Sequence, residues 1–154
     1  MKENVFVKIS GDLIKRSDVL EWIRSLSIDH FVVVCSGGGT QINKAFEEKG
    51  ILTVFGPLGR EIERFEDRQL ARELLERNQG EIQDLLWESN IPAAVVIPVL
   101  DIGSVLCHVN GDIFVLAAYL GFDRLYVLTL EERVAKKREE FKAYPKIEVI
   151  GFPA

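Results

Sequence analysis

Apolar and polar positions alternate along the chain in blocks that have the lengths of strands and helices. Short runs of β-branched and aromatic residues, such as 4–9 (NVFVKI) and 30–35 (HFVVVC), predict strands. The run at 30–35 is continuously apolar, which is typical of a strand covered on both faces. The longer segments between such runs carry apolar residues three to four positions apart and predict helices.

The pattern predicts further strands at 51–56, 93–100, 124–129 and 146–152, with a short additional strand at 104–109. Helices are expected at 19–26, 40–50, 111–121 and 130–144. Asp18 is expected to cap the first helix with Glu21 as its capping-box partner, and Gly50 to end the second. Residues 59–90 fit either one bent helix or two helices broken near 78–80. The segment 111–121 is apolar almost all round, which predicts an internal helix.

Strands that alternate with helices throughout predict a parallel sheet with helices on both faces. We therefore expect a three-layer α/β/α sandwich with a mainly parallel sheet, built as a single domain over residues 1–154. In such sheets ligands bind outside the carboxyl ends of the strands, near helix N-termini. The glycine-rich and polar turns of this sequence fall there.

The amino-acid composition narrows the class of protein. The chain has 154 residues, 47% of them hydrophobic, and a net charge of -5 without a basic stripe, which argues against a nucleic-acid partner. No apolar run is long enough to cross a bilayer, and no signal peptide is visible. Cys35 and Cys107 are expected to be buried free thiols in a reducing compartment, which favours the cytoplasm. Two histidines without Cys/His spacing give no support for a metal site.

The first unusual junction follows the strand 4–9, where Lys8 precedes Ser10, Gly11 and Asp12. Glycine lets the backbone turn tightly and expose N–H donors, and a lysine supplies a point charge suited to phosphate. The alternative is that Lys8 lies on an edge strand, where a lysine discourages aggregation. Both interpretations stay open from these residues alone.

The second junction is the run Gly37, Gly38, Gly39 and Thr40 between a core strand and a helix. Each glycine raises the cost of ordering the chain by up to about 1 kcal/mol relative to alanine, and the helix start behind the run is suited to anions. The spacing fits neither the dinucleotide fingerprint nor a P-loop. A flexible connection is the alternative.

The third junction is the stretch from His108 through Asn110 to Asp112, at the start of the expected internal helix. An aspartate there caps a helix or complements its dipole, and Asn110-Gly111 is also typical of a plain turn. His108 fits a strand histidine whose ring is satisfied locally. Each of these three signals is weak by itself.

Together and in this order, the three junctions resemble the amino acid kinase family, which includes acetylglutamate, carbamate, uridylate and isopentenyl phosphate kinases. The stretches that carry the resemblance are VFVKISGDLI, FVVVCSGGGTQIN, IPAAVVIPVL and HVNGDIFVLAAYLGFDRLYVLT. They span roughly residues 4–56 and 91–129.

The resemblance implies a role for each matching position. Lys8 would neutralise charge on the transferred phosphoryl group, Ser10 and Gly11 would approach the phosphates, and Asp112 would orient active-site lysines. The acceptor would lie along a set of residues with one shared role, namely Gly37, Gly38, Gly39, Thr40, His108 and Asn110. ATP and Mg²⁺ are the implied cofactors, because phosphoryl transfer depends on positioning and charge neutralisation.

Three features depart from such kinases. Leu130 stands where the family has the first aspartate of an acid-rich turn. Residues 130–154 are few for the lobe that holds adenine, ribose and a second catalytic lysine, for which Lys136, Lys137, Lys142 and Lys146 are candidates. Residues 57–64 leave little room for a substrate lid hairpin.

Two functions follow. One is a minimal kinase that transfers the γ-phosphoryl group of ATP to a small carboxylate, carbamate or phosphate acceptor, with a reduced nucleotide lobe or one completed by a neighbouring subunit in a homo-oligomer. The other is an inactive member that binds a nucleotide or oxyanion for sensing, storage or assembly. The acceptor has no signature in the sequence.

Overall fold

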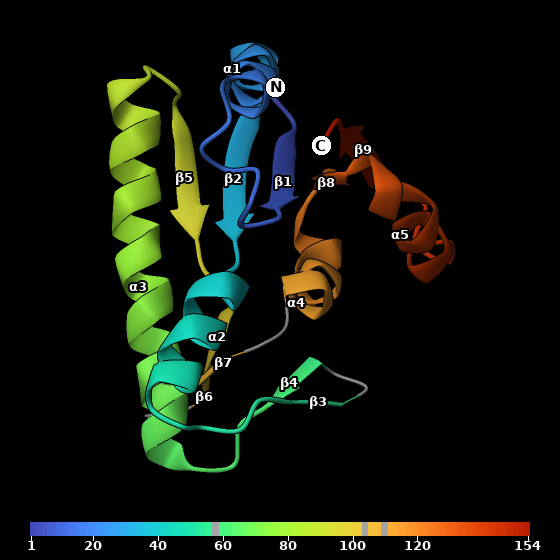
Figure 1. The fold of residues 1–154 in the computed structure, drawn as a ribbon. Coiled ribbons are helices and arrows are strands. Elements are labelled where there is room, and N and C mark those ends of the chain that lie inside the picture. Colours follow the sequence, from blue (N-terminus) through green and yellow to red (C-terminus); the bar gives the residue numbers. More distant parts are fainter. Residues whose placement is uncertain (57–58, 103–104, 109–110) are drawn as a thin grey trace.

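The computed structural model describes residues 1–56, 59–102, 105–108 and 111–154, and within 100–108 it describes the backbone alone. Its centre is a parallel sheet of five strands in the order β5-β2-β1-β8-β9 (Figure 1). The strands are β1 (Asn4–Ile9), β2 (Phe31–Ser36), β5 (Ala93–Val96), β8 (Arg124–Leu130) and β9 (Ile147–Phe152). Every pairing in this sheet is parallel, as expected for strands joined through helices.

Helices cover both faces of the sheet, which confirms the α/β/α sandwich. One face packs against α1 (Ser17–Asp29) and α3 (Phe65–Glu88), and its core includes Val5 and Val7 of β1. The other face packs against α4 (Gly111–Ala118) and the segment around α5 (Val134–Glu140), and its core includes Phe6. Because side chains alternate along a strand, Lys8 lies on the same face as Phe6.

Cys35 also lies on this second face, opposite Lys8 in the β1–β2 ladder. It is a fully buried free thiol, as the sequence predicts. Burial raises the pKa of Cys35 to about 12, although the charge of Lys8 acts in the opposite direction. The thiol is therefore protonated at neutral pH and behaves as a small apolar group. The side chain of Cys107 lies outside the described residues.

Below the carboxyl ends of the sheet lies a smaller unit (Figure 1). Here α2 (Gly39–Glu48) packs against the first half of α3 through Ile42, Phe46, Ala71 and Leu75. Gly50 follows α2 with a φ of 65°, a left-handed conformation that favours glycine, so the predicted helix end is confirmed.

Two short antiparallel hairpins complete this lower unit. One joins β3 (Val54–Gly56) to β4 (Gly59–Glu61), so a small hairpin does form where the sequence left little room for one. The other joins β6 (Val99–Ile102) to β7 (Val105–His108). The expected single strand at 93–100 is wrong, because the chain leaves the main sheet after Val96 and passes through Pro98 into β6.

Two details of the helices differ from the sequence pattern, and a third resolves an alternative that the pattern left open. Asp18 does not cap α1. It lies in the first turn and binds the Arg16 guanidinium at 2.6 Å, while Glu21 pairs with Arg24. α3 is one continuous helix through Gly80, which settles the alternative left open at 59–90. The expected helix at 130–144 is shorter, because β8 runs to Leu130 and a 3₁₀ turn (η2, Glu131–Arg133) precedes α5.

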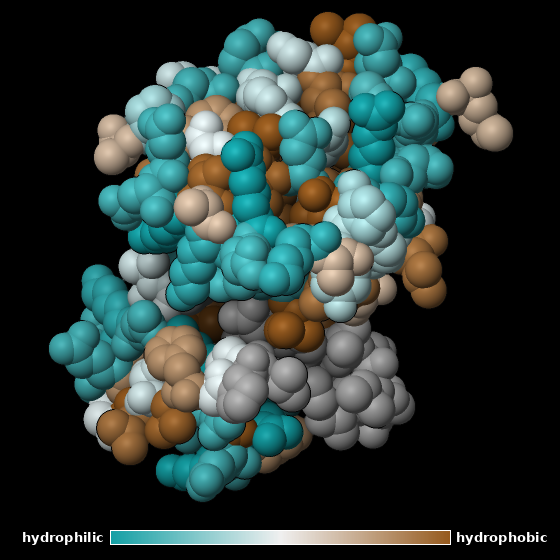
Figure 2. Space-filling model, turned by 90° about the vertical axis from the view of Figure 1, so that its right-hand side faces the viewer, coloured by the Kyte–Doolittle hydropathy of each residue, from teal (hydrophilic) through white to brown (hydrophobic). Residues whose placement is uncertain are grey.

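The prediction that 111–121 is an internal helix is only partly right. α4 ends at Ala118, a 3₁₀ turn (η1, Tyr119–Gly121) follows, and only Val115 is fully buried. Leu120 is 92% exposed. Figure 2, which views the molecule from the side of α5 and β9, shows apolar residues at the surface between hydrophilic ones. In the part of the chain that the structure describes, no helix is both long enough and apolar enough to cross a bilayer.

The edge strand β5 is closed by side chains from α3. The Gln83 amide accepts a hydrogen bond from the Val95 N–H at 3.0 Å and donates one to the Ala93 carbonyl at 3.1 Å. Gln79 donates to the Val95 carbonyl at 2.8 Å. These bonds satisfy backbone groups that an edge strand would otherwise present to another chain.

Candidate functional site

A cavity of about 210 Å³ lies at the carboxyl ends of β1 and β2, where the N-terminal ends of α2 and α4 also meet. Its lining combines the turn after β1, the glycine loop after β2, the start of α4 and the 3₁₀ turn after β8. The lining residues are Lys8, Ile9, Ser10, Gly11, Asp12, Gly37, Gly39, Thr40, Gly111, Asp112 and Arg133. The three junctions singled out in the sequence therefore meet around one cavity.

Asp112 holds two lysines, one on each carboxylate oxygen. The Lys8 Nζ lies 3.2 Å from Oδ1, and the Lys137 Nζ lies 2.5 Å from Oδ2. Lys137 also donates to Glu140 at 2.9 Å. The side chains of Lys8, Lys137 and Asp112 are 12%, 18% and 22% exposed, so this cluster is largely shielded from solvent but borders the cavity.

The electrostatics of the cluster favour the charged forms of Asp112 and Lys137. Burial by itself would raise the pKa of Asp112, but the charge of Lys8 and the hydrogen bond from Lys137 outweigh it and hold the pKa below its usual value. Burial would lower the pKa of Lys137, but hydrogen bonds to Asp112 and Glu140 raise it overall. With Glu140 included, two ammonium groups are balanced by two carboxylates, and Lys8 is the ammonium group that lines the cavity.

Gly111 makes room for the Lys8 side chain. A Cβ added at Gly111 would lie 3.1 Å from Cε of Lys8, closer than most real contacts. The glycine therefore lets the lysine pass the start of α4 and reach Asp112 in the next position. A plain turn was one interpretation of Asn110-Gly111, and the close approach of Lys8 is a separate physical reason for the glycine.

The three glycines of the loop after β2 have different environments. A Cβ added at Gly38 would lie 3.0 Å from both the Asn78 amide nitrogen and Cδ2 of Leu75, so packing against α3 requires this glycine. A Cβ at Gly37 or Gly39 would meet nothing within 4 Å. Gly37 and Gly39 line the cavity, whereas Gly38 faces α3.

The turn after β1 lies against the glycine loop. Its backbone is fixed by the Ser10 N–H, which donates to the Leu128 carbonyl at 3.2 Å, and by the Leu13 N–H, which donates to Ser10 at 2.9 Å. A Cβ at Gly11 would lie 3.6 Å from the Gly37 carbonyl. The two glycine-containing turns therefore border the cavity from adjacent strands.

Two predicted acceptor residues cannot be placed at the cavity. His108 is the last residue of β7, but its side chain lies outside the described residues, and so does the whole of Asn110. Their expected roles remain predictions from the resemblance.

Sequence reasoning did not single out Lys137 from the four candidate lysines. Its position on α5 becomes informative only when β8, α5 and α4 are packed together. Of the other three, Lys136 is 80% exposed, Lys142 pairs with Glu139 on the surface, and Lys146 donates to the Phe122 carbonyl.

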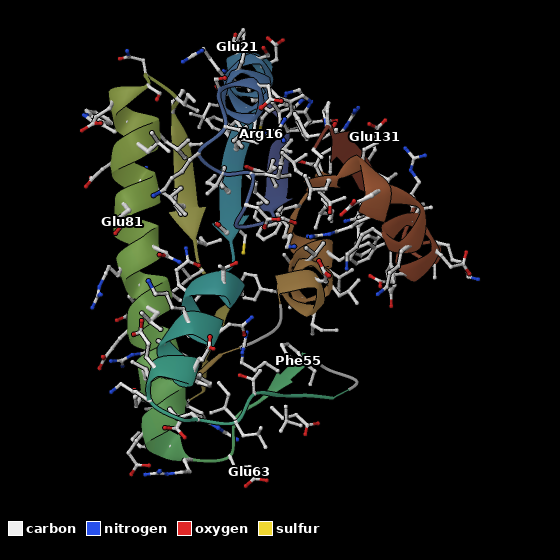
Figure 3. All side chains as sticks on the ribbon, viewed as in Figure 1. Arg16, Glu21, Phe55, Glu63, Glu81 and Glu131 are labelled. Carbon is white, nitrogen blue, oxygen red and sulfur yellow. The ribbon has the colours of Figure 1, made fainter. Side chains whose placement is uncertain are left out.

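Arg60 was also missed, because residues 57–64 contain no motif. Its guanidinium lies over the rings of Phe46 and Phe55, at 5.8 and 5.0 Å from their centroids, and Nη2 donates to the Gly39 carbonyl at 3.3 Å. Nη1 is buried and has no partner among the described residues. Partial burial lowers the pKa of Arg60. Phe55 extends from the hairpin in the lower unit (Figure 3), so Arg60 links that hairpin to the glycine loop.

A larger cavity lies elsewhere among the described residues. It has a volume of about 420 Å³ and lies between the end of α2, the hairpin and the start of α3, where Phe46, Ile51, Lys49, Glu61 and Arg64 are among its lining residues. Volume by itself does not identify a site. The smaller cavity has the glycine turns, the shielded charges and the strand ends, and we place the candidate site there.

The described residues contain no group of three or more His, Cys, Asp or Glu side chains that could hold a metal ion. The few carboxylates at the cavity fit Mg²⁺ that arrives with phosphate groups, because Mg²⁺ is commonly bound by one or two carboxylates together with substrate phosphates. The carboxylates that line the cavity are Asp12 and Asp112. Asp12 is half exposed at the mouth, whereas Asp112 is already bound by two lysines.

Solved structures share this fold. The structure of smu.665 from Streptococcus mutans UA159 matches with a TM-score of 0.66 and 16% identity, over 92% of this chain and 84% of that one. N-acetylglutamate synthase from Neisseria gonorrhoeae, complexed with coenzyme A and L-arginine, matches with a TM-score of 0.54 and 10% identity, over 84% of this chain and 44% of the synthase. Isopentenyl phosphate kinase matches with a TM-score of 0.50 and 15% identity, over 96% of this chain and 91% of the kinase.

These matches define the fold as amino acid kinase-like. The chain spans less than half the length of the synthase. No family model matches the sequence. No curated protein matches it at a significant level.

Proposed function

We propose that the protein is a small-molecule transferase that moves the γ-phosphoryl group of ATP to a small carboxylate, carbamate or phosphate acceptor. The observation that carries this proposal is the Lys8–Asp112–Lys137 cluster at the border of a cavity rimmed by two glycine turns. The solved structures that share the fold of this chain include a kinase and a synthase.

In the proposed reaction an acceptor oxygen attacks the γ-phosphorus, a new P–O bond forms, and the bond to the β-phosphate oxygen breaks to release ADP. Negative charge develops on the equatorial and leaving oxygens during this step. Lys8 would neutralise it from β1 and Lys137 from α5, while Asp112 holds both ammonium groups in place. Mg²⁺ bound with the nucleotide would supply further charge neutralisation, with Asp12 as the carboxylate at the mouth.

The acceptor would lie on the side of the cavity formed by Gly37, Gly39 and Thr40. Arg60 supports an anionic acceptor there, because its guanidinium is held by two aromatic rings and by the Gly39 carbonyl. A partly desolvated arginine with an unpartnered nitrogen is suited to a carboxylate or phosphate. We propose that His108 and Asn110 contribute to the same subsite. We also propose that residues 1–154 form a single domain with a small-molecule substrate, and that the protein is a cytoplasmic homo-oligomer.

A second function is favoured by one observation. Leu130 ends β8 in the place of the first aspartate of the turn that the resemblance implies, and the 3₁₀ turn η2 follows at once with Glu131 and Glu132. The second proposal is that the protein binds a nucleotide or oxyanion without transferring a phosphoryl group, for sensing, storage or assembly.

Thermal unfolding with and without ATP and Mg²⁺ tests the first function, because a ligand that binds only the folded state raises the melting temperature. We expect a rise for the wild-type protein, no rise for Lys8→Ala, and a normal rise for Lys15→Ala, whose side chain is 74% exposed. No rise with any nucleotide would exclude the kinase. A rise with phosphate but no phosphoryl transfer to any acceptor would select the binding protein.

A further inference from the structure

An ion pair crosses the mouth of the candidate site. Arg133 comes from the 3₁₀ turn η2 after β8, and Asp12 comes from the turn after β1. The Arg133 Nη1 lies 3.6 Å from Oδ2 of Asp12, and both side chains line the cavity. The Arg133 Nε lies 3.8 Å from Oε1 of Glu132, which is 69% exposed. Neither residue was assigned a role by the sequence.

This pair differs from the cluster deeper in the cavity. Arg133 and Asp12 are 47% and 48% exposed, and 3.6 Å is longer than a charge-assisted hydrogen bond. Exposed ion pairs of this kind contribute at most about 1 kcal/mol. The Lys8–Asp112–Lys137 cluster is shielded and includes a contact of 2.5 Å. The pair at the mouth is therefore the weaker of the two and the easier to exchange for another ligand.

The side chain types at the mouth suit one exchange in particular. Arginine is always charged, and its planar guanidinium can bind two phosphate oxygens at once. Asp12, at 3.6 Å from Arg133, does not make such a two-point contact. Lys8 of β1 lines the same cavity as Arg133. A ligand with several linked phosphates would contact Lys8 and Arg133 together, whereas a single phosphate has fewer oxygens to share.

We propose that Arg133 is a polyphosphate-binding residue and that Asp12 holds it at the mouth until the ligand arrives. The bound ligand takes the place of Asp12 on the guanidinium, and Asp12 becomes available to the Mg²⁺ that accompanies the phosphates. The subsite therefore selects linked phosphates, in a nucleotide or in an inorganic chain, over single phosphate. This inference rests on the proposed function, because it adds a residue to the same site.

The test is isothermal titration of tripolyphosphate, ATP and orthophosphate, each with Mg²⁺, into the wild-type protein and three variants. Arg133→Gln removes the charge and keeps a polar side chain. Asp12→Asn removes the competing carboxylate. Lys136→Gln is the matched control, because it removes an exposed cation three residues further along the chain, 4.0 Å from Glu140.

We expect Arg133→Gln to weaken tripolyphosphate and ATP binding about 10- to 100-fold, as for the loss of hydrogen bonds to a charged group. Orthophosphate affinity should change less than about 3-fold, because Lys8 remains in place. Asp12→Asn should bind tripolyphosphate without Mg²⁺ more tightly than the wild-type protein, and Lys136→Gln should match the wild type. The melting temperature without ligand should stay the same in all three variants, because the ion pairs that these substitutions remove are exposed.

The outcomes separate the two proposals. Wild-type binding that Arg133→Gln leaves intact overturns the role of Arg133 and leaves the proposed function standing. Equal loss of orthophosphate and tripolyphosphate overturns the selectivity for linked phosphates. Absence of binding by the wild-type protein for all three ligands overturns the proposed function together with this inference.

Discussion

Lys8 and Asp112 lie at distant positions in the sequence, yet their charged groups are 3.2 Å apart. The parallel sheet brings them together, because β1 pairs directly with β8 and α4 lies just before β8 in the chain. Lys137 reaches the same carboxylate from the helix that follows β8. The cluster therefore exists only when β1, β8 and the helices on one face of the sheet are all in place.

Gly111→Ala should disturb this cluster without removing a charge. The added Cβ would lie 3.1 Å from Cε of Lys8, so the lysine side chain must shift by a few tenths of an ångström. We expect the stabilisation by ATP and Mg²⁺ to fall markedly, although alanine is the better helix former. Nucleotide titration checks this, and an unchanged affinity would show that the ammonium position is unimportant.

Gly80→Ala is the control for that variant. Gly80 lies inside α3, and a Cβ there would meet nothing within 4 Å. We expect a gain in stability of up to about 1 kcal/mol and no change in ligand binding. Urea denaturation measures the gain.

The lowered pKa of Asp112 makes stability depend on pH on the acid side. The folded carboxyl group binds a proton less readily than the unfolded one, so the unfolded state takes up the proton first as the pH falls. The contribution of Asp112 is complete above its unfolded pKa of about 3.9 and is lost as the pH falls through the lower folded value.

Asp112→Asn tests this dependence. It should lower the free energy of unfolding by about 1–3 kcal/mol at pH 7, because two shielded lysines lose their shared carboxylate. The difference from the wild-type protein should shrink below pH 4. A difference that stays constant down to pH 2 would contradict the assigned cause. Denaturation curves between pH 2 and pH 7 give the measurement.

Gly38→Ala should destabilise the fold, whereas Gly39→Ala should not. The added Cβ at Gly38 meets Leu75 and Asn78 at 3.0 Å, which typically costs about 1–3 kcal/mol, and the one at Gly39 meets open space. Thermal unfolding of the two variants compares positions that the sequence treats as equivalent. Equal stability would place the reason for Gly38 outside packing.

Gln83→Leu removes the amide that bonds to two backbone groups of β5. Unpaired groups at a partly buried strand edge cost about 1–3 kcal/mol, so the free energy of unfolding should fall by that amount. Gln41→Leu on the exposed surface of α2 is the control and should have little effect. A similar loss in both variants would mean that the edge bonds contribute nothing specific.

Much of the fold could be predicted because its signals are local. The apolar runs of β1 and β2 and the alternation of strands and helices indicate a parallel sheet, and the structure confirms it. The split of 93–100 could not be predicted, since the apolar pattern continues across the point where β5 ends and β6 begins. Aspartate is a residue type that often caps helices, but the carboxylate of Asp18 binds the Arg16 guanidinium instead.

The candidate site was only partly visible in the sequence. Lys8, Gly11, Gly37 and Asp112 follow strands or begin helices, so position in the chain predicts where they gather. The surroundings of Lys137 and Arg60 arise only when separate elements pack together, so the sequence does not reveal them. Lys137 belongs to a charged helix that looks like a solvated surface, and Arg60 acquires its surroundings from two aromatic rings on other elements.

α3 touches two important parts of the molecule on successive turns. Leu75 and Asn78 support Gly38, and Gln79 and Gln83 bond to the outer edge of β5. A helix is stiff over so short a length, so the loop that borders the cavity keeps a fixed spacing from the sheet. Changes to this stretch of α3 should therefore alter the candidate site at a distance, through side chains that do not line its cavity.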